Sequence, residues 1–164
     1  MPDPALLKWI EGTGLSVEMR EGAFAYPLVG AFHLLAIALF GGMVAATDLR
    51  LLGWALKGRP VSTLIRDLRP WKWLGFGIVT VTGLLLMWGE PVQLYHSPSF
   101  WAKMALMALV GVHAAIFRPG VYAFPETLDA VVTREAKLAA AMSLILWAGL
   151  IFSGRLIAFD ASFD

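Results

Sequence analysis

The chain has 164 residues, enough for one domain, and 59% of them are hydrophobic while only 15% are charged. Soluble domains are typically about 45–50% apolar and about 25% charged, so this composition argues against a water-soluble enzyme and excludes disorder. The sequence has no cysteine, which excludes disulfides, thiolate zinc sites, iron–sulfur clusters and covalently attached haem. A net charge of +1 leaves no polybasic surface for nucleic acid. The composition therefore predicts an integral membrane protein.

Four apolar segments have the length of membrane spans, which need about 17–25 residues. Because backbone groups in lipid must be satisfied internally, each segment is predicted to be a helix. We expect an all-α, up-down-up-down four-helix bundle that occupies residues 23–164. The four expected spans are Ala23–Thr47, Trp73–Gly89, Phe100–Phe117 and Leu138–Phe159.

The distribution of basic residues predicts the orientation of the bundle. Nine lysines and arginines lie at or between the inner ends of spans one and two or of spans three and four, and four lie on the opposite side. This asymmetry puts the two basic loops in the cytoplasm and both termini outside, and we expect the membrane to be the inner membrane of a bacterium. A short helix over Val61–Leu68, ended by Pro70, is expected in the first loop, and Pro119 is expected to turn the chain after the third span.

The N-terminal segment, residues 1–22, reads as a separate element because apolar residues of 4–20 fall roughly on one helical stripe. It lacks the basic start of a secretory signal. We expect one helix that lies on the outer membrane surface, the alternative being a soluble lead-in.

His33 is the first candidate for chemistry, because ionisable residues at membrane depth are costly to bury. It lies ten residues into its span, about 15 Å deep at the helical rise. Gly30 and Gly41 on the same face are expected to leave room beside the imidazole. That room would admit a flat haem whose iron His33 ligates, or His33 would be a copper ligand; the alternative is the close approach of another helix.

His113 is the second candidate, four residues before the expected inner end of the third span. With His33 it would form a bis-histidine haem site if helix tilt absorbs a depth difference of about 5 Å. The alternative is a histidine that reaches the inner interface. His96, in the outer loop, would matter together with His33 and methionines if the metal were copper.

Lys103 and Arg155 are two cations near the outer ends of their spans, and buried cations need anionic partners or a path to water. Haem propionates would serve both of them. Glu90, Asp160 and lipid phosphate are the alternative partners. At the opposite end, Asp48 and its charged neighbours read as ion pairs that hold the bundle together.

Several sequence runs carry a resemblance to known proteins. The runs are AFHLLAIALFGG, DLRLLG, TGLLL, FWAKMALMALVGV and SLILWAGLIFSGRLIAF. Over nearly its whole length the chain resembles a family of small uncharacterised bacterial inner-membrane proteins. More distantly it is similar to CopD-like copper-resistance domains and HemJ-type protoporphyrinogen oxidases. The resemblance implies that five residues occupy family positions: His33, Gly41, Thr82, Gly83 and Lys103.

The preferred interpretation is a membrane protein that binds b-type haem and takes part in electron transfer or a haem-linked redox step, as a possible subunit of a larger complex or a homo-oligomer. His33 and His113 would be the iron ligands, with Lys103 and Arg155 at the propionates. The alternatives are copper translocation and a structural subunit without a cofactor.

Overall fold

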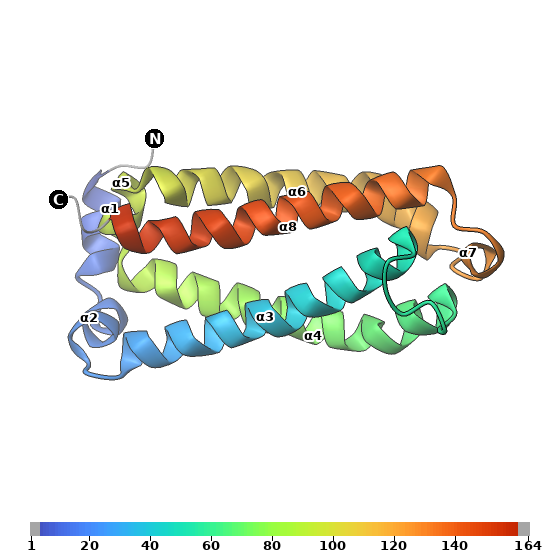
Figure 1. Cartoon of the computed structure of the whole chain (residues 1–164). Coiled ribbons are helices and arrows are strands. Elements are labelled where there is room, and N and C mark those ends of the chain that lie inside the picture. The colour runs from blue at the N-terminus through green and yellow to red at the C-terminus, as the bar shows by residue number, and fades with distance from the viewer. Residues whose placement is uncertain (1–3, 161–164) are drawn as a thin grey trace.

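The computed structural model describes residues 4–160, and every regular element in that part of the chain is a helix (Figure 1). The eight helices are α1 (Pro4–Glu11), α2 (Gly14–Glu21), α3 (Ala25–Leu52), α4 (Val61–Gly89), α5 (Pro91–His96), α6 (Pro98–Tyr122), α7 (Thr127–Ala130) and α8 (Arg134–Asp160). The all-α expectation is confirmed for the residues described.

Four of these helices, α3, α4, α6 and α8, are long and apolar enough to cross a membrane. Most of their large apolar side chains are exposed, as in Leu34, Val112 and Ile145, which suits contact with lipid hydrocarbon rather than water. The chain is therefore a multi-pass membrane protein. Polar residues continue each helix beyond the apolar segment that predicted it: α3 runs on to Leu52, α4 begins already at Val61, and α6 and α8 are longer at both ends.

The long helices form two hairpins, α3 with α4 and α6 with α8, and the hairpins meet mainly along α3 and α8 (Figure 1). Helices α4 and α6 share no extended interface. Helices α1, α2 and α5 gather at one end of the bundle, called here the termini end, and α7 lies at the other, the α7 end. The bundle is thus held together along only one of the two sides where the hairpins could meet.

At the termini end, the expected single helix over 4–20 is wrong. Two helices, α1 and α2, are separated at Gly12 and Thr13, because Thr13 adopts an extended backbone and precedes the first turn of α2. The fully buried Ser16 donates to the carbonyl of Gly89, and the Trp88 indole donates to the Thr13 hydroxyl. These bonds attach the N-terminal segment to the end of α4.

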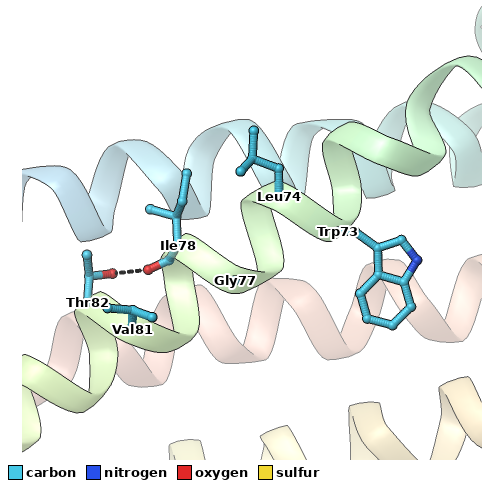
Figure 2. Close-up of a pocket in the computed structure, with 6 residues that line it drawn as sticks. All are labelled: Trp73, Leu74, Gly77, Ile78, Val81 and Thr82. Carbon is cyan, nitrogen blue, oxygen red and sulfur yellow. Dashed lines mark hydrogen bonds between the residues drawn. The ribbon is translucent and has the colours of Figure 1, made fainter.

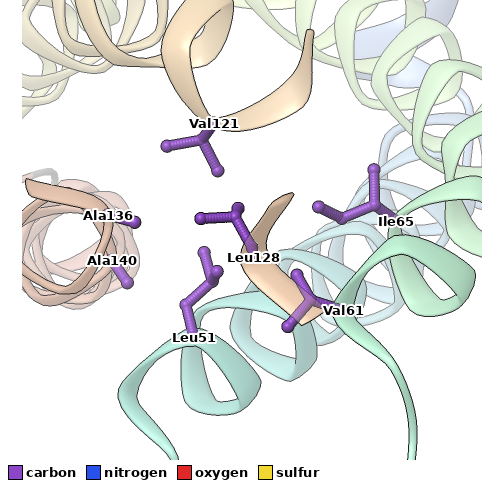
Figure 3. Close-up of a cluster of buried hydrophobic side chains, with 7 residues drawn as sticks. All are labelled: Leu51, Val61, Ile65, Val121, Leu128, Ala136 and Ala140. Atoms are coloured by element: carbon purple, nitrogen blue, oxygen red, sulfur yellow. The ribbon is translucent and has the colours of Figure 1, made fainter. Parts of the chain in front are cut away.

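At the α7 end, a cluster of buried apolar side chains from the four long helices and α7 closes the bundle (Figure 3). Its members are Leu51, Val61, Ile65, Val121, Leu128, Ala136 and Ala140. The carboxylate of Asp129, on α7, accepts bonds from the backbone N–H and the hydroxyl of Ser62 at 2.9 and 2.6 Å. Asp129 therefore caps the N-terminus of α4 from 67 positions away in sequence.

Two expected breaks are absent, so these expectations are wrong. Pro70 lies inside α4 and Pro119 inside α6, and neither ends its helix. A proline leaves only the carbonyl four residues earlier without its helical donor, and its fixed φ suits a helix. Both prolines are exposed near the α7 end, where the carbonyls of Arg66 and Ala115 lose that donor at little cost if water or headgroups reach them.

Candidate functional site

His33 lies on α3 with only 8% of its surface exposed, and its Nδ1 is 2.8 Å from Oγ1 of Thr82 on α4. The Thr82 hydroxyl directs its own proton to the carbonyl of Ile78, at 2.6 Å. Oγ1 therefore accepts the proton of His33 Nδ1, and the neutral ring carries its lone pair on Nε2. This is the tautomer that a metal-ligating histidine takes when a neighbour orients it.

The imidazole of His33 packs directly against the backbone of Gly83. A β-carbon placed on Gly83 would lie 3.1 Å from His33 Cε1, closer than nearly all real contacts of that kind. Every seventh residue of α3 repeats this arrangement: Gly89 lies against Tyr26, and Gly75 against Phe40. We call this line of contacts the α3–α4 seam. Small residues here let two membrane helices approach closely.

The glycines expected beside His33 lie elsewhere. A β-carbon on Gly30 would meet nothing within 4 Å, and one on Gly41 would be in ordinary contact, at 3.7 Å, with the ring of Trp147 on α8. The space that Gly41 leaves is therefore filled by tryptophan, and the glycine that touches the imidazole is Gly83. The sequence run TGLLL carried this signal, since Thr82 and Gly83 begin it.

Lys103, on α6, turns toward the inside of the bundle. Its Nζ lies 3.6 Å from the position of a β-carbon on Gly154 of α8, and it is close enough to His33 to interact with it electrostatically. The structure thus joins His33 and Thr82 by a hydrogen bond, and it places Lys103 of α6 within electrostatic range of His33, where Gly154 of α8 makes room for the lysine.

His113 is held within the other hairpin. Its Nε2 lies 3.0 Å from the carbonyl of Ala139 on α8, and its ring lies against Phe117. A carbonyl only accepts, so Nε2 donates and the neutral ring has its lone pair on Nδ1. Since α3 and α6 share no extended interface, the two histidines are held by different partners.

Arg155 is exposed, and within residues 4–160 its side chain makes no hydrogen bond or ion pair. Its two expected protein partners are engaged elsewhere. Glu90 interacts with the hydroxyl of Tyr26, and Asp160 accepts bonds from Ser97 and Ser99 at the start of α6.

An apolar groove of about 390 Å³ runs along α4 and is open to the outside of the bundle (Figure 2). The groove is lined by Trp73, Leu74, Gly77, Ile78, Val81 and Thr82. At one end lies Thr82, the residue that also holds His33. His96, by contrast, is exposed on α5 with its ring against Tyr95.

Polar side chains at the α7 end form a cluster that the sequence patterns did not reveal. Asp48 makes no ion pair there, contrary to expectation. Lys72 donates to the hydroxyl of Thr47 at 2.6 Å. The usable signal was the spacing, because Thr47 lies two steps of seven residues from His33 on the same face of α3. The members of this polar cluster are Thr47, Asp48, Lys72, Arg118, Tyr122 and Ser143.

The fold and these sites define a multi-pass helical membrane protein with polar groups inside the bundle. A family model matches residues 7–160, so the chain belongs to DUF6644, a family of unknown function. No curated protein and no solved structure matches the chain significantly.

Proposed function

We propose that the protein binds b-type haem and transfers electrons, and that His33 would hold the iron through Nε2. The observation that carries the proposal is the His33–Thr82 hydrogen bond, because it leaves a lone pair on Nε2 of a buried, oriented imidazole at membrane depth. An ionisable residue in this position is a functional candidate by default.

The surrounding residues fit this role in part. Lys103 would supply a positive charge for a propionate, as expected. Helices α4 and α6 share no extended interface, so a flat group could enter between the hairpins without separating packed helices. The close contact with Gly83 on α4 leaves the ring of His33 little exposed, so a group that enters between the hairpins would reach Nε2 only if α3 and α4 also separate near His33.

The remaining expected site residues stay predictions. His113 would ligate through Nδ1 if it kept its bond to Ala139. Arg155 would have to turn inward to reach a propionate. When bound, the haem would supply one-electron chemistry at iron, and this chain would position the group and shield it from water.

The test is an absorption spectrum of the protein purified in detergent from haem-replete bacteria. We expect a Soret band that is lost in His33→Ala and retained in His96→Ala, the matched control at an exposed histidine. The absence of a Soret band in the wild-type protein, both as purified and after incubation with haem, would overturn the proposal.

A structural role without a cofactor is the second candidate, and the α3–α4 seam favours it. His33 is already bonded to Thr82 and packed on Gly83, which is what a purely structural histidine would show. In that case His33→Ala should lower the thermal stability of a protein that has no Soret band. Copper translocation stays a prediction. Within residues 4–160 no three His, Asp or Glu side chains gather to hold a metal ion.

The proposed orientation places the loops of the α7 end in the cytoplasm and the termini outside, in a bacterial inner membrane. A C-terminal fusion to a reporter that is active only in the cytoplasm should be inactive. A fusion after Gly58, in the first loop, should be active, and the reverse pattern would invert the topology.

A further inference from the structure

The polar cluster at the α7 end receives side chains from all four long helices. Thr47 and Asp48 come from α3, Lys72 from α4, and Ser143 from α8. Helix α6 adds two residues that hold the cationic groups against aromatic rings. Lys72 lies 5.6 Å from the ring centre of Tyr122, and Arg118 lies over the rings of Tyr122 and Trp73.

Apolar layers border this cluster on both sides. Toward the loops, Leu51 and Ala140 of the buried cluster in Figure 3 lie about one helical turn beyond Asp48 and Ser143. Toward His33, the ring of Phe40 contacts Trp147 edge-on at 5.3 Å and Phe76 at 6.1 Å. The layers lie between the polar cluster and the loops on one side and between the cluster and the histidine site on the other, while the exposed Arg118 leaves the cluster open to the side of the bundle.

Within this cluster Asp48 is only 5% exposed, and its Oδ2 has no hydrogen-bond partner among residues 4–160. Ser143 is a hydrogen-bond partner of the carboxyl group. No cationic group among the described residues lies within 4 Å of the carboxylate as an ion pair. Lys72, the nearest candidate, donates instead to Thr47.

A buried carboxylate that lacks an ion pair is unstable as an anion, so Asp48 needs a proton or a cation. A metal ion is disfavoured because Lys72 and Arg118 already place positive charge at the site, and because no three His, Asp or Glu side chains gather to hold a metal ion within residues 4–160. A proton needs only one oxygen, and Oδ2 is free to take it.

We propose that Asp48 is a proton-binding site, at which Oδ2 takes a proton from water and later returns it. The charged and titratable groups that interact with it are Lys72 from α4 and Tyr122 from α6, whose ring also lies against Arg118, while α8 contributes the Ser143 hydroxyl. The positive charge of Lys72 and the Ser143 bond favour release, and burial favours uptake. The site is independent of the proposed haem function.

Infrared difference spectroscopy of the full chain in nanodiscs, titrated with acid and base, tests the proposal. Beside the carboxylic-acid C=O bands of the other Asp and Glu residues, we expect one component that titrates with pH in the wild-type protein and is missing from Asp48→Asn. Asp160→Asn should retain the band, because that carboxylate already accepts bonds from Ser97 and Ser99. Identical C=O titrations in the wild-type protein and in Asp48→Asn overturn the proposal.

Two further variants keep the test decisive if Asp48→Asn does not fold. Lys72→Met removes a positive charge and Ser143→Ala removes a donor, so each should move the band to a higher titration midpoint. Lys137→Met, at the exposed start of α8, is the matched control and should leave the midpoint unchanged. A wild-type protein without a titrating band, or one whose midpoint ignores both variants, would also overturn the proposal.

Discussion

Thr82 determines which nitrogen of His33 carries the proton. Its hydroxyl lies 2.8 Å from Nδ1, and when it gives its own proton to the carbonyl of Ile78 it accepts the proton of the ring. This contact joins α3 to α4 and leaves Nε2 as the ring's only acceptor or ligand atom.

Thr82→Val keeps the shape of the side chain and removes the acceptor. If His33 ligates haem, we expect haem affinity to fall by about 10- to 100-fold, the usual cost of losing a bond that orients a ligand. Thr82→Ser should retain most of the affinity. A haem titration followed at the Soret band measures the affinity of both variants. Equal affinity in Thr82→Val and the wild-type protein would show that Thr82 does not orient the ligand.

Gly83→Ala should destabilise the bundle because the added β-carbon would lie 3.1 Å from His33. Overpacking of this kind lowers the free energy of unfolding by about 1–3 kcal/mol, and unfolding in mixed micelles measures this loss. Gly30→Ala is the control on α3, since its β-carbon would meet nothing within 4 Å. We expect that variant to be neutral or slightly stabilised. A larger loss for Gly30→Ala would contradict the α3–α4 seam.

Lys103→Met removes a positive charge close to His33. In a haem-loaded protein the midpoint potential should fall, because the lost charge had favoured the reduced state. Lys103→Arg keeps the positive charge and should have a midpoint potential close to that of the wild-type protein. Redox titration monitored by the absorption spectrum provides the measurement, and an unchanged potential in Lys103→Met would separate the lysine from the haem.

Asp129 makes the stability of the α7 end depend on acid. The hydroxyl and backbone N–H of Ser62 hold the pKa of Asp129 below its usual value. A carboxyl group whose pKa is depressed in the folded protein stabilises the fold at pH values above its pKa in the unfolded chain, which is about 4. This contribution is lost as the pH falls from there toward the lower pKa of the folded state.

Asp129→Asn should therefore lower the Tm at neutral pH and flatten its decline below about pH 4. Asp67→Asn, which alters an exposed pair with Arg59, is the control and should behave like wild type. Thermal unfolding in detergent across this pH range checks both. An unchanged acid dependence in Asp129→Asn would show that the cap does not contribute.

The membrane class and the four spans could be predicted from the amino-acid sequence, because the hydrophobicity of a helix-length segment is a local property. Lipid then requires such a segment to be helical. The sequence also singled out His33 and Lys103, since ionisable groups stand out within apolar runs. Pro70 and Pro119 were misread for the same local reason, because a rule about single residues takes no account of where the freed carbonyl lies.

The contacts between side chains of different helices became visible only in the folded chain. Thr82 and Gly83 face His33 across two helices, and Asp129 reaches Ser62 over 67 positions. Asp48 carried the same charge in the sequence as any other aspartate. Its buried oxygen lacks a partner because Lys72 donates to Thr47 instead, and because apolar side chains from four helices pack beside it. Such properties arise from packing between distant segments, which no pattern of spacing along one helix contains.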